Sequence, residues 1–172
     1  MKQCFSTALT DSAKTDIEGV GSVRHGTNGE RYMWVKNVST TTALTAGMAA
    51  CHRFADGADM FKYIDVPATA NLSLLAGIVR STSIAAYSAS AATACFGWIQ
   101  IFGYCGTVSV FQSQTTVKSL GTHLKGVDAQ TYLDTDVAAG VAPIYRRTVQ
   151  LLETIATVTT GAAASKKAFI FN

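Results

Sequence analysis

The 172-residue chain has few charged residues, and this scarcity excludes several classes of protein. Asp, Glu, Lys and Arg make up 15% of the residues, whereas about a quarter is typical of soluble domains. The net charge is +3, and the densest basic positions are two isolated pairs, at 146–147 and 166–167. Proteins that bind nucleic acid usually gather Lys and Arg on one face. We therefore expect no nucleic-acid partner.

Long apolar runs and proline-rich joints are missing as well. The only prolines are Pro67 and Pro143, and no low-complexity segment divides the chain. The N-terminus lacks the apolar stretch of a signal peptide, and the longest apolar stretches have the length of strands, so no membrane span is expected. Because 48% of the residues are apolar, the chain can still form a core. The sequence predicts one folded domain that is made in the cytoplasm.

Reactive side chains are few and scattered. The four cysteines include no close C-x-x-C pair, which zinc and redox sites require. We expect Cys51, Cys95 and Cys105 to be small core residues, with no disulfides in a reducing cytosol. Cys51 and His52 are adjacent, but neighbours on a strand point to opposite faces and cannot readily act as a nucleophile and its base.

Two further motifs resemble functional sites but are incomplete. GVGSVRHG at 19–26 has Arg24 where a dinucleotide-binding loop has its third glycine, and no helical pattern follows. Asp134 and Asp136 would offer two carboxylates to a hard cation, but no other ligands follow at loop spacing, so a solvated turn is favoured. The sequence therefore predicts a non-enzymatic protein with no cofactor and no metal.

Short segments rich in β-branched and aromatic residues alternate with turns, which predicts a mainly β fold with little helix. The strongest expected strand is FGWIQIFGYCGTVSVF at 96–111, which Gly103 and Gly106 interrupt, and this suggests a bulge or a corner between strands. Trp34 and Trp98 lie within expected strands and are predicted core residues. The alanine-rich segment 85–95 suits either a helix or an extended linker. Further strands are expected within 31–38, 48–54, 61–66, 72–83, 148–158 and 166–172. Within 72–83, Gly77 is expected to form a turn before the strand begins.

Three segments carry a family resemblance. LLAGIV at 74–79 is followed by an alanine-rich stretch and then by FGWIQIFGYCGTV at 96–108. Together with GERYMWVKNVSTTTALTAGMAA at 29–50, this order resembles the tailed-bacteriophage capsid decoration (cement) protein family. The resemblance covers about half of the chain, and residues 109–147 add nothing to it.

The resemblance implies a compact β-barrel or β-tulip-like domain that forms a homotrimer or another homo-oligomer. Such a protein binds the major capsid protein on the outside of the virion, after synthesis in the host cytoplasm. It bridges neighbouring capsid subunits and stabilises the shell without chemistry. A linked oligomer gains avidity even when each copy binds weakly.

Residues 1–18 are expected to form an extended N-terminal arm, and residues 19–172 the single β-rich domain. The arm carries four sparse apolar residues that we expect to bind the capsid: Cys4, Phe5, Leu9 and Ile17. An extended segment of this kind can add backbone hydrogen bonds and small apolar contacts to a neighbour's surface. A disordered tail is the alternative.

Three other functions stay open. The first is another virion component, namely a head fibre, head-closure or coat subunit, which the copy number per particle would distinguish. The second is a cellular β-barrel module that binds a ligand, which would show a concave aromatic site. The third is an enzyme, for which no complete motif is present.

Overall fold

The computed structural model describes residues 5–53, 61–67, 75–112, 117–127, 130–135, 148–159 and 161–171. These residues contain thirteen strands and no helix, which confirms the mainly β fold. The strands are β1 (Ser12–Ala13), β2 (Val23–His25), β3 (Arg31–Asn37), β4 (Leu44–Thr45), β5 (Ala49–His52), β6 (Tyr63–Asp65), β7 (Leu75–Val79), β8 (Ser83–Ile84), β9 (Phe96–Gln112), β10 (His123–Gly126), β11 (Leu133–Thr135), β12 (Thr148–Leu151) and β13 (Ala162–Phe171).

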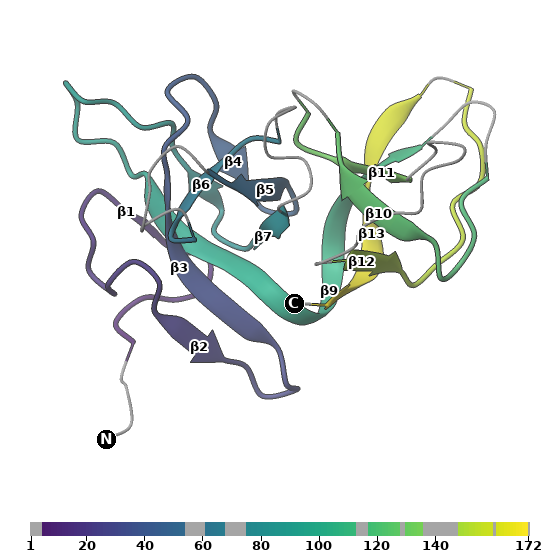
Figure 1. Cartoon of the computed structure of the whole chain (residues 1–172), viewed down its shortest axis with the longest axis horizontal. Coiled ribbons are helices and arrows are strands. Elements are labelled where there is room, and N and C mark those ends of the chain that lie inside the picture. The colour runs from purple at the N-terminus through teal and green to yellow at the C-terminus, as the bar shows by residue number, and fades with distance from the viewer. Residues whose placement is uncertain are drawn as a thin grey trace.

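Strand β9 is the longest and joins the two halves of an eleven-stranded sheet. Its N-terminal half belongs to a closed circuit of pairings, β9-β7-β5-β6-β3, which we call the first circuit. Its C-terminal half belongs to the second circuit, β9-β13-β12-β10-β11. Figure 1 shows the two circuits on either side of the bent β9. The strand pairing thus has two circuits where the sequence predicted a single barrel or tulip.

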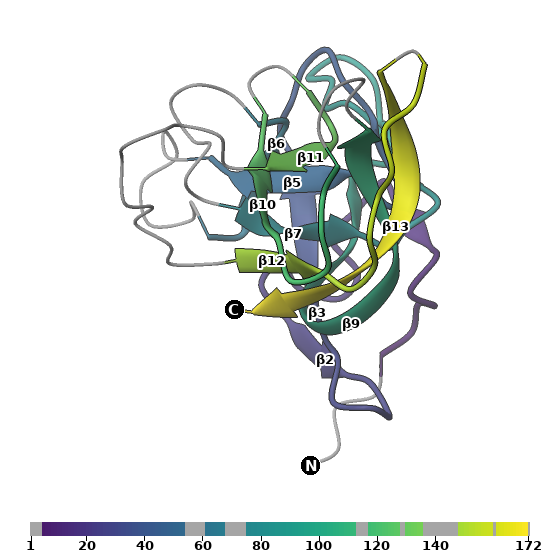
Figure 2. The ribbon, with the colours of Figure 1, turned by 90° about the vertical axis from the view of Figure 1, so that its right-hand side faces the viewer.

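The bend in β9 lies at Gly103, as the sequence predicted. Antiparallel pairing with β3 extends to Phe102, and pairing with β13 begins at Gly103. Gly103 has a φ of 96°, a left-handed conformation that glycine adopts without a steric penalty. Figure 2 shows β13 running alongside the C-terminal half of β9. One residue therefore transfers the strand from the first circuit to the second.

A second glycine, Gly77, lets the neighbouring strands β7 and β9 lie unusually close together. The sequence predicted a turn at Gly77, but the structure places this residue inside β7. A Cβ atom at Gly77 would overlap the backbone carbonyl oxygen of Gln100 on β9. Gly77 therefore allows close backbone contact and does not end a turn.

The two circuits share one core, and the chain forms a compact single domain. The largest apolar cluster combines Cys51 and Leu75 of the first circuit with Val110, Leu133 and Val149 of the second. A smaller cluster fills the first circuit around Val35, Ile64 and Ile99, among other residues. The predicted core cysteines Cys51, Cys95 and Cys105 are all buried, which confirms that assignment.

The alanine-rich segment that the sequence left open contains no helix and no strand. Residues 85–95 form a loop that leads from β8 into β9. Within this loop, the backbone N–H of Ala85 donates to the carbonyl of Ala94 at 2.9 Å, so its two ends are held together. The loop forms one wall of a surface cavity described below.

Trp98 has no solvent exposure and packs against Trp34 with ring centroids 5.2 Å apart. We predict that Trp98→Ala lowers the free energy of unfolding by about 3–5 kcal/mol, because a large cavity replaces the indole ring. Chemical denaturation followed by circular dichroism measures this change. Wild-type stability in the variant would contradict the position of Trp98 in the core.

Candidate functional site

The N-terminal segment packs against its own domain. Phe5, Leu9 and Ala13 pack against the cluster formed by Trp34 and Trp98. The ring of Phe5 lies edge-on to that of Trp98, with centroids 5.3 Å apart. Strand β1 adds two residue pairs along the first residues of β9. The segment therefore covers the outer face of the two tryptophans.

Polar groups of the segment bind both indole N–H groups. Trp98 Nε1 donates to Thr7 Oγ1 at 2.9 Å, and Trp34 Nε1 donates to Asp16 Oδ1 at 3.0 Å. A buried indole N–H without an acceptor would be destabilising, and these two contacts remove that cost. The tryptophans and the segment therefore stabilise one another.

Glu18 closes the segment into a loop. One carboxylate oxygen of Glu18 accepts the backbone N–H of Ser6 at 2.9 Å and that of Thr7 at 2.7 Å. It also accepts the hydroxyls of Ser6 at 3.0 Å and Thr7 at 2.6 Å. Burial raises the pKa of Glu18, but the hydrogen bonds from Thr7 and Ser6 outweigh this effect and hold the pKa below its ordinary value.

The expected capsid-binding residues that the structure describes occupy two different environments. Phe5 and Leu9 are partly buried against the tryptophans, and the side chain of Ile17 is 52% exposed. Cys4 lies outside the described residues. Residues 5–18 thus lie along the domain, whereas the sequence predicted an extended arm. The physical reason is that Phe5 and Leu9 cover a face of the tryptophan pair that would otherwise be exposed to solvent.

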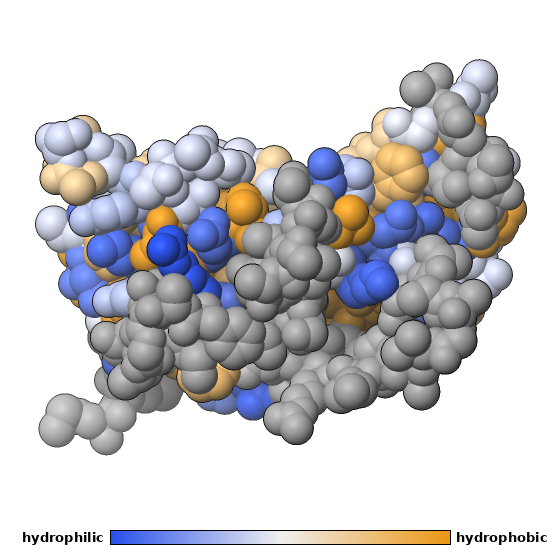
Figure 3. Space-filling view, turned by 45° about the horizontal axis from the view of Figure 1, so that its top comes forward, coloured by the Kyte–Doolittle hydropathy of each residue, from blue (hydrophilic) through white to orange (hydrophobic). Residues whose placement is uncertain are grey.

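A second surface of interest lies at one end of the second circuit. Val117, Leu120 and Leu152 are large apolar residues with exposed fractions of 54%, 64% and 36%, and we call these three the apolar end. Their segments are held together by paired backbone hydrogen bonds between Lys118 and Ile155, at 3.0 and 2.8 Å. Figure 3 shows apolar side chains scattered over both halves of one face of the molecule, between larger areas of polar surface. No sequence motif indicated this surface, since its members lie in unrelated turns.

The sequence favoured a solvated turn for Asp134 and Asp136, but Asp134 lies in strand β11. Asp134 Oδ1 lies 2.8 Å from Nζ of Lys118, whose side chain is almost fully buried. Asp136 lies outside the described residues. Within the described ranges, no three His, Cys, Asp or Glu side chains are grouped so that they could hold a metal ion. Asp134 therefore balances the charge of a buried lysine.

Cys51 is also not arranged as a nucleophile. Burial, with a contribution from the charge of Asp65, raises the pKa of the Cys51 thiol to about 12. A thiol with so high a pKa carries almost no thiolate at neutral pH, and the thiolate is the reactive form. This agrees with the role of Cys51 as a core residue.

Comparison with known proteins found no matching family model, no matching curated protein and no matching solved structure. The described residues include no helix long and apolar enough to span a membrane.

We predict that acidification releases the N-terminal segment through Glu18. Because the folded-state pKa of Glu18 is depressed, its stabilisation is present above its ordinary pKa and is lost as the pH falls through the folded value. The protection factors of the Ser6 and Thr7 amides, which compare their exchange rates with those of an unstructured peptide at the same pH, should fall over that range. In Glu18→Gln these protection factors should be smaller at neutral pH and should depend less on pH. Identical pH profiles for the two proteins would refute the role of Glu18.

Proposed function

We propose that the chain is a non-enzymatic structural virion protein that binds the outer surface of a phage capsid and stabilises the shell by bridging major capsid subunits. The family resemblance of the segments at 29–50, 74–79 and 96–108 supports this proposal. So does a composition with little charge, which suits a surface that packs against other proteins. The protein would act as a homotrimer or another homo-oligomer on the capsid exterior.

The observation that carries the proposal is the apolar end. Three large apolar side chains are exposed on segments that are fixed to one another by backbone hydrogen bonds. Full burial of a Val or Leu side chain contributes about 1.5–3 kcal/mol. Exposed apolar side chains on segments that are fixed to one another can be buried together by a partner protein, and this is how they would contribute to an interface. We assign the capsid contact to this surface first.

The N-terminal segment is the other candidate for attachment. Phe5 and Leu9 already pack against the tryptophan pair, so binding through them would require the segment to leave its own domain. Such a release would expose Trp34 and Trp98 and would cost their hydrogen bonds to Asp16 and Thr7. Ile17 remains available without this cost, because its side chain is exposed.

We predict that the triple variant Val117→Ser, Leu120→Ser and Leu152→Ser weakens binding to the capsid. The expected loss is at least about tenfold in affinity, or about 1.4 kcal/mol. Sedimentation of the protein with empty capsids, assembled from the major capsid protein of the same genome, measures the affinity and the copy number. Repeated bridging of subunits requires on the order of hundreds of copies per particle. A head-closure protein would give about a dozen copies or fewer.

Two single variants make the experiment selective. Tyr104→Ser removes an exposed aromatic residue on β9 outside the apolar end and should leave binding unchanged. Ile17→Ser tests the N-terminal segment directly. If Ile17→Ser abolishes binding and the triple variant does not, attachment belongs to the N-terminal segment. If neither the wild-type protein nor any variant binds the capsid, the decoration function is refuted.

A further inference from the structure

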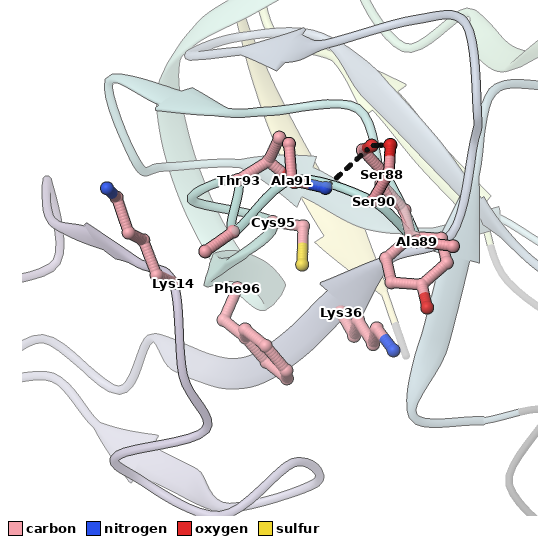
Figure 4. A pocket seen from close by; sticks show the side chains of 11 residues that line it. Lys14, Lys36, Ser88, Ala89, Ser90, Ala91, Thr93, Cys95 and Phe96 are labelled. Atoms are coloured by element: carbon pink, nitrogen blue, oxygen red, sulfur yellow. Dashed lines mark hydrogen bonds between the residues drawn. The ribbon is translucent and has the colours of Figure 1, made fainter.

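A surface cavity with a volume of about 380 Å³ lies between the loop before β9 and strand β3. Its walls include Lys14, Lys36, Tyr87, Phe96 and the serines Ser88 and Ser90. Figure 4 shows the loop residues on one side and the side chains of Lys36 and Phe96 on the other. A second hollow of about 280 Å³ shares Lys36 and Phe96 and adds Lys62 and Tyr63. The two hollows thus meet at one lysine and one aromatic ring.

Lys36 is held among three aromatic rings. Its Nζ atom lies 4.3 Å from the ring centroid of Tyr87, 5.7 Å from that of Tyr63 and 5.8 Å from that of Phe96. Cation–π attraction of this kind fixes the position of an ammonium group but supplies no anion. No carboxylate among the described residues forms an ion pair with Lys36. The ammonium group of Lys36 is therefore held in a defined position and can bind an anionic group of a ligand.

The charges around the two hollows are mainly positive. Three lysines, Lys14, Lys36 and Lys62, line them together with one carboxylate, that of Asp16. This carboxylate already accepts the indole N–H of Trp34 at 3.0 Å and the backbone N–H of Val20 at 2.9 Å. In a chain with so few charges, this concentration of lysines favours an acidic ligand.

The loop opposite Lys36 presents hydroxyl groups. The hydroxyls of Ser88 and Ser90 lie 3.2 Å apart at the cavity wall (Figure 4), and Ser88 Oγ also accepts the backbone N–H of Ala91 at 3.2 Å. Thr93 also lines the cavity, but its Oγ1 atom is shielded from the surface. A polar ligand with several hydroxyls would use this loop.

We propose that the cavity binds a carboxylate-bearing sugar of an acidic polysaccharide. The carboxylate would bind Lys36, the apolar C–H face of the sugar ring would pack on the exposed part of Phe96, and its hydroxyls would bind Ser88 and Ser90. The volume is within the range of small-molecule pockets and exceeds what a single inorganic anion needs. Single-stranded nucleic acid is less favoured, because it requires a charged groove that follows several phosphates. This binding site is independent of the capsid contact.

The experiment is an NMR titration of the full chain with an oligosaccharide that contains glucuronate. We expect saturable shifts of the backbone amides of Lys36, Ser88 and Phe96, and binding at least about tenfold weaker for the matched neutral glucose oligosaccharide, because a hydrogen bond to a charged group is the stronger kind. Lys36→Met keeps the aliphatic stem among the aromatic rings and should weaken glucuronate binding by a similar factor. Lys167→Met, which lies on β13 away from the cavity, is the matched control and should bind as the wild type does.

Four outcomes of the sugar and phosphate titrations would overturn the proposal. They are the absence of saturable shifts, equal binding of the neutral sugar, equal loss of binding in Lys167→Met, and saturation of the same amides by inorganic phosphate at equal affinity. Tighter binding of a short single-stranded oligonucleotide would overturn it as well and would assign the cavity to nucleic acid. Thermal unfolding of each variant separates a loss of binding from a loss of fold.

Discussion

The continuous backbone pairing of β9 is the constraint on which the rest of the structure depends. The strand pairs with β3 and β7 before its corner at Gly103 and with β13 and β11 beyond it. Phe96, the first residue of β9, lines the cavity that also contains Lys36. Strand β13, which pairs with the C-terminal half of β9, belongs to the second circuit. The cavity and the apolar end are therefore held at fixed positions on one scaffold, which is what a bridging or binding protein requires.

The N-terminal segment stabilises the fold, and the same contacts occupy side chains that could otherwise bind a partner. It supplies acceptors to two buried indoles, and its own fold depends on the carboxylate of Glu18. Residues that would bind a neighbour from an extended arm are thereby used within the chain.

Local patterns predicted the elements, and non-local pairing determined the sites. The expected strands at 31–38 and 96–111, the buried tryptophans and the buried cysteines follow from residue type and alternation, which are local properties. The two circuits could not be predicted, because pairing partners such as β9 and β13 are far apart in sequence. The same holds for the aromatic surroundings of Lys36, whose rings come from β6, the loop before β9 and β9 itself. The sequence predicted a turn at Gly77 because glycine is common in turns. The structure shows a different reason for the glycine, since its backbone lies too close to the carbonyl oxygen of Gln100 for a Cβ atom to fit.

Native-state hydrogen exchange along β9 tests the central claim that this strand makes one cooperative unit of both circuits. If it does, the paired amides of residues 97–102 and of residues 104–110 exchange only through global unfolding, with the same free energy and the same dependence on denaturant. If one half of the strand exchanges through a separate opening of lower free energy, the two circuits fold independently. The shared core and the fixed placement of the binding surfaces would then be contradicted.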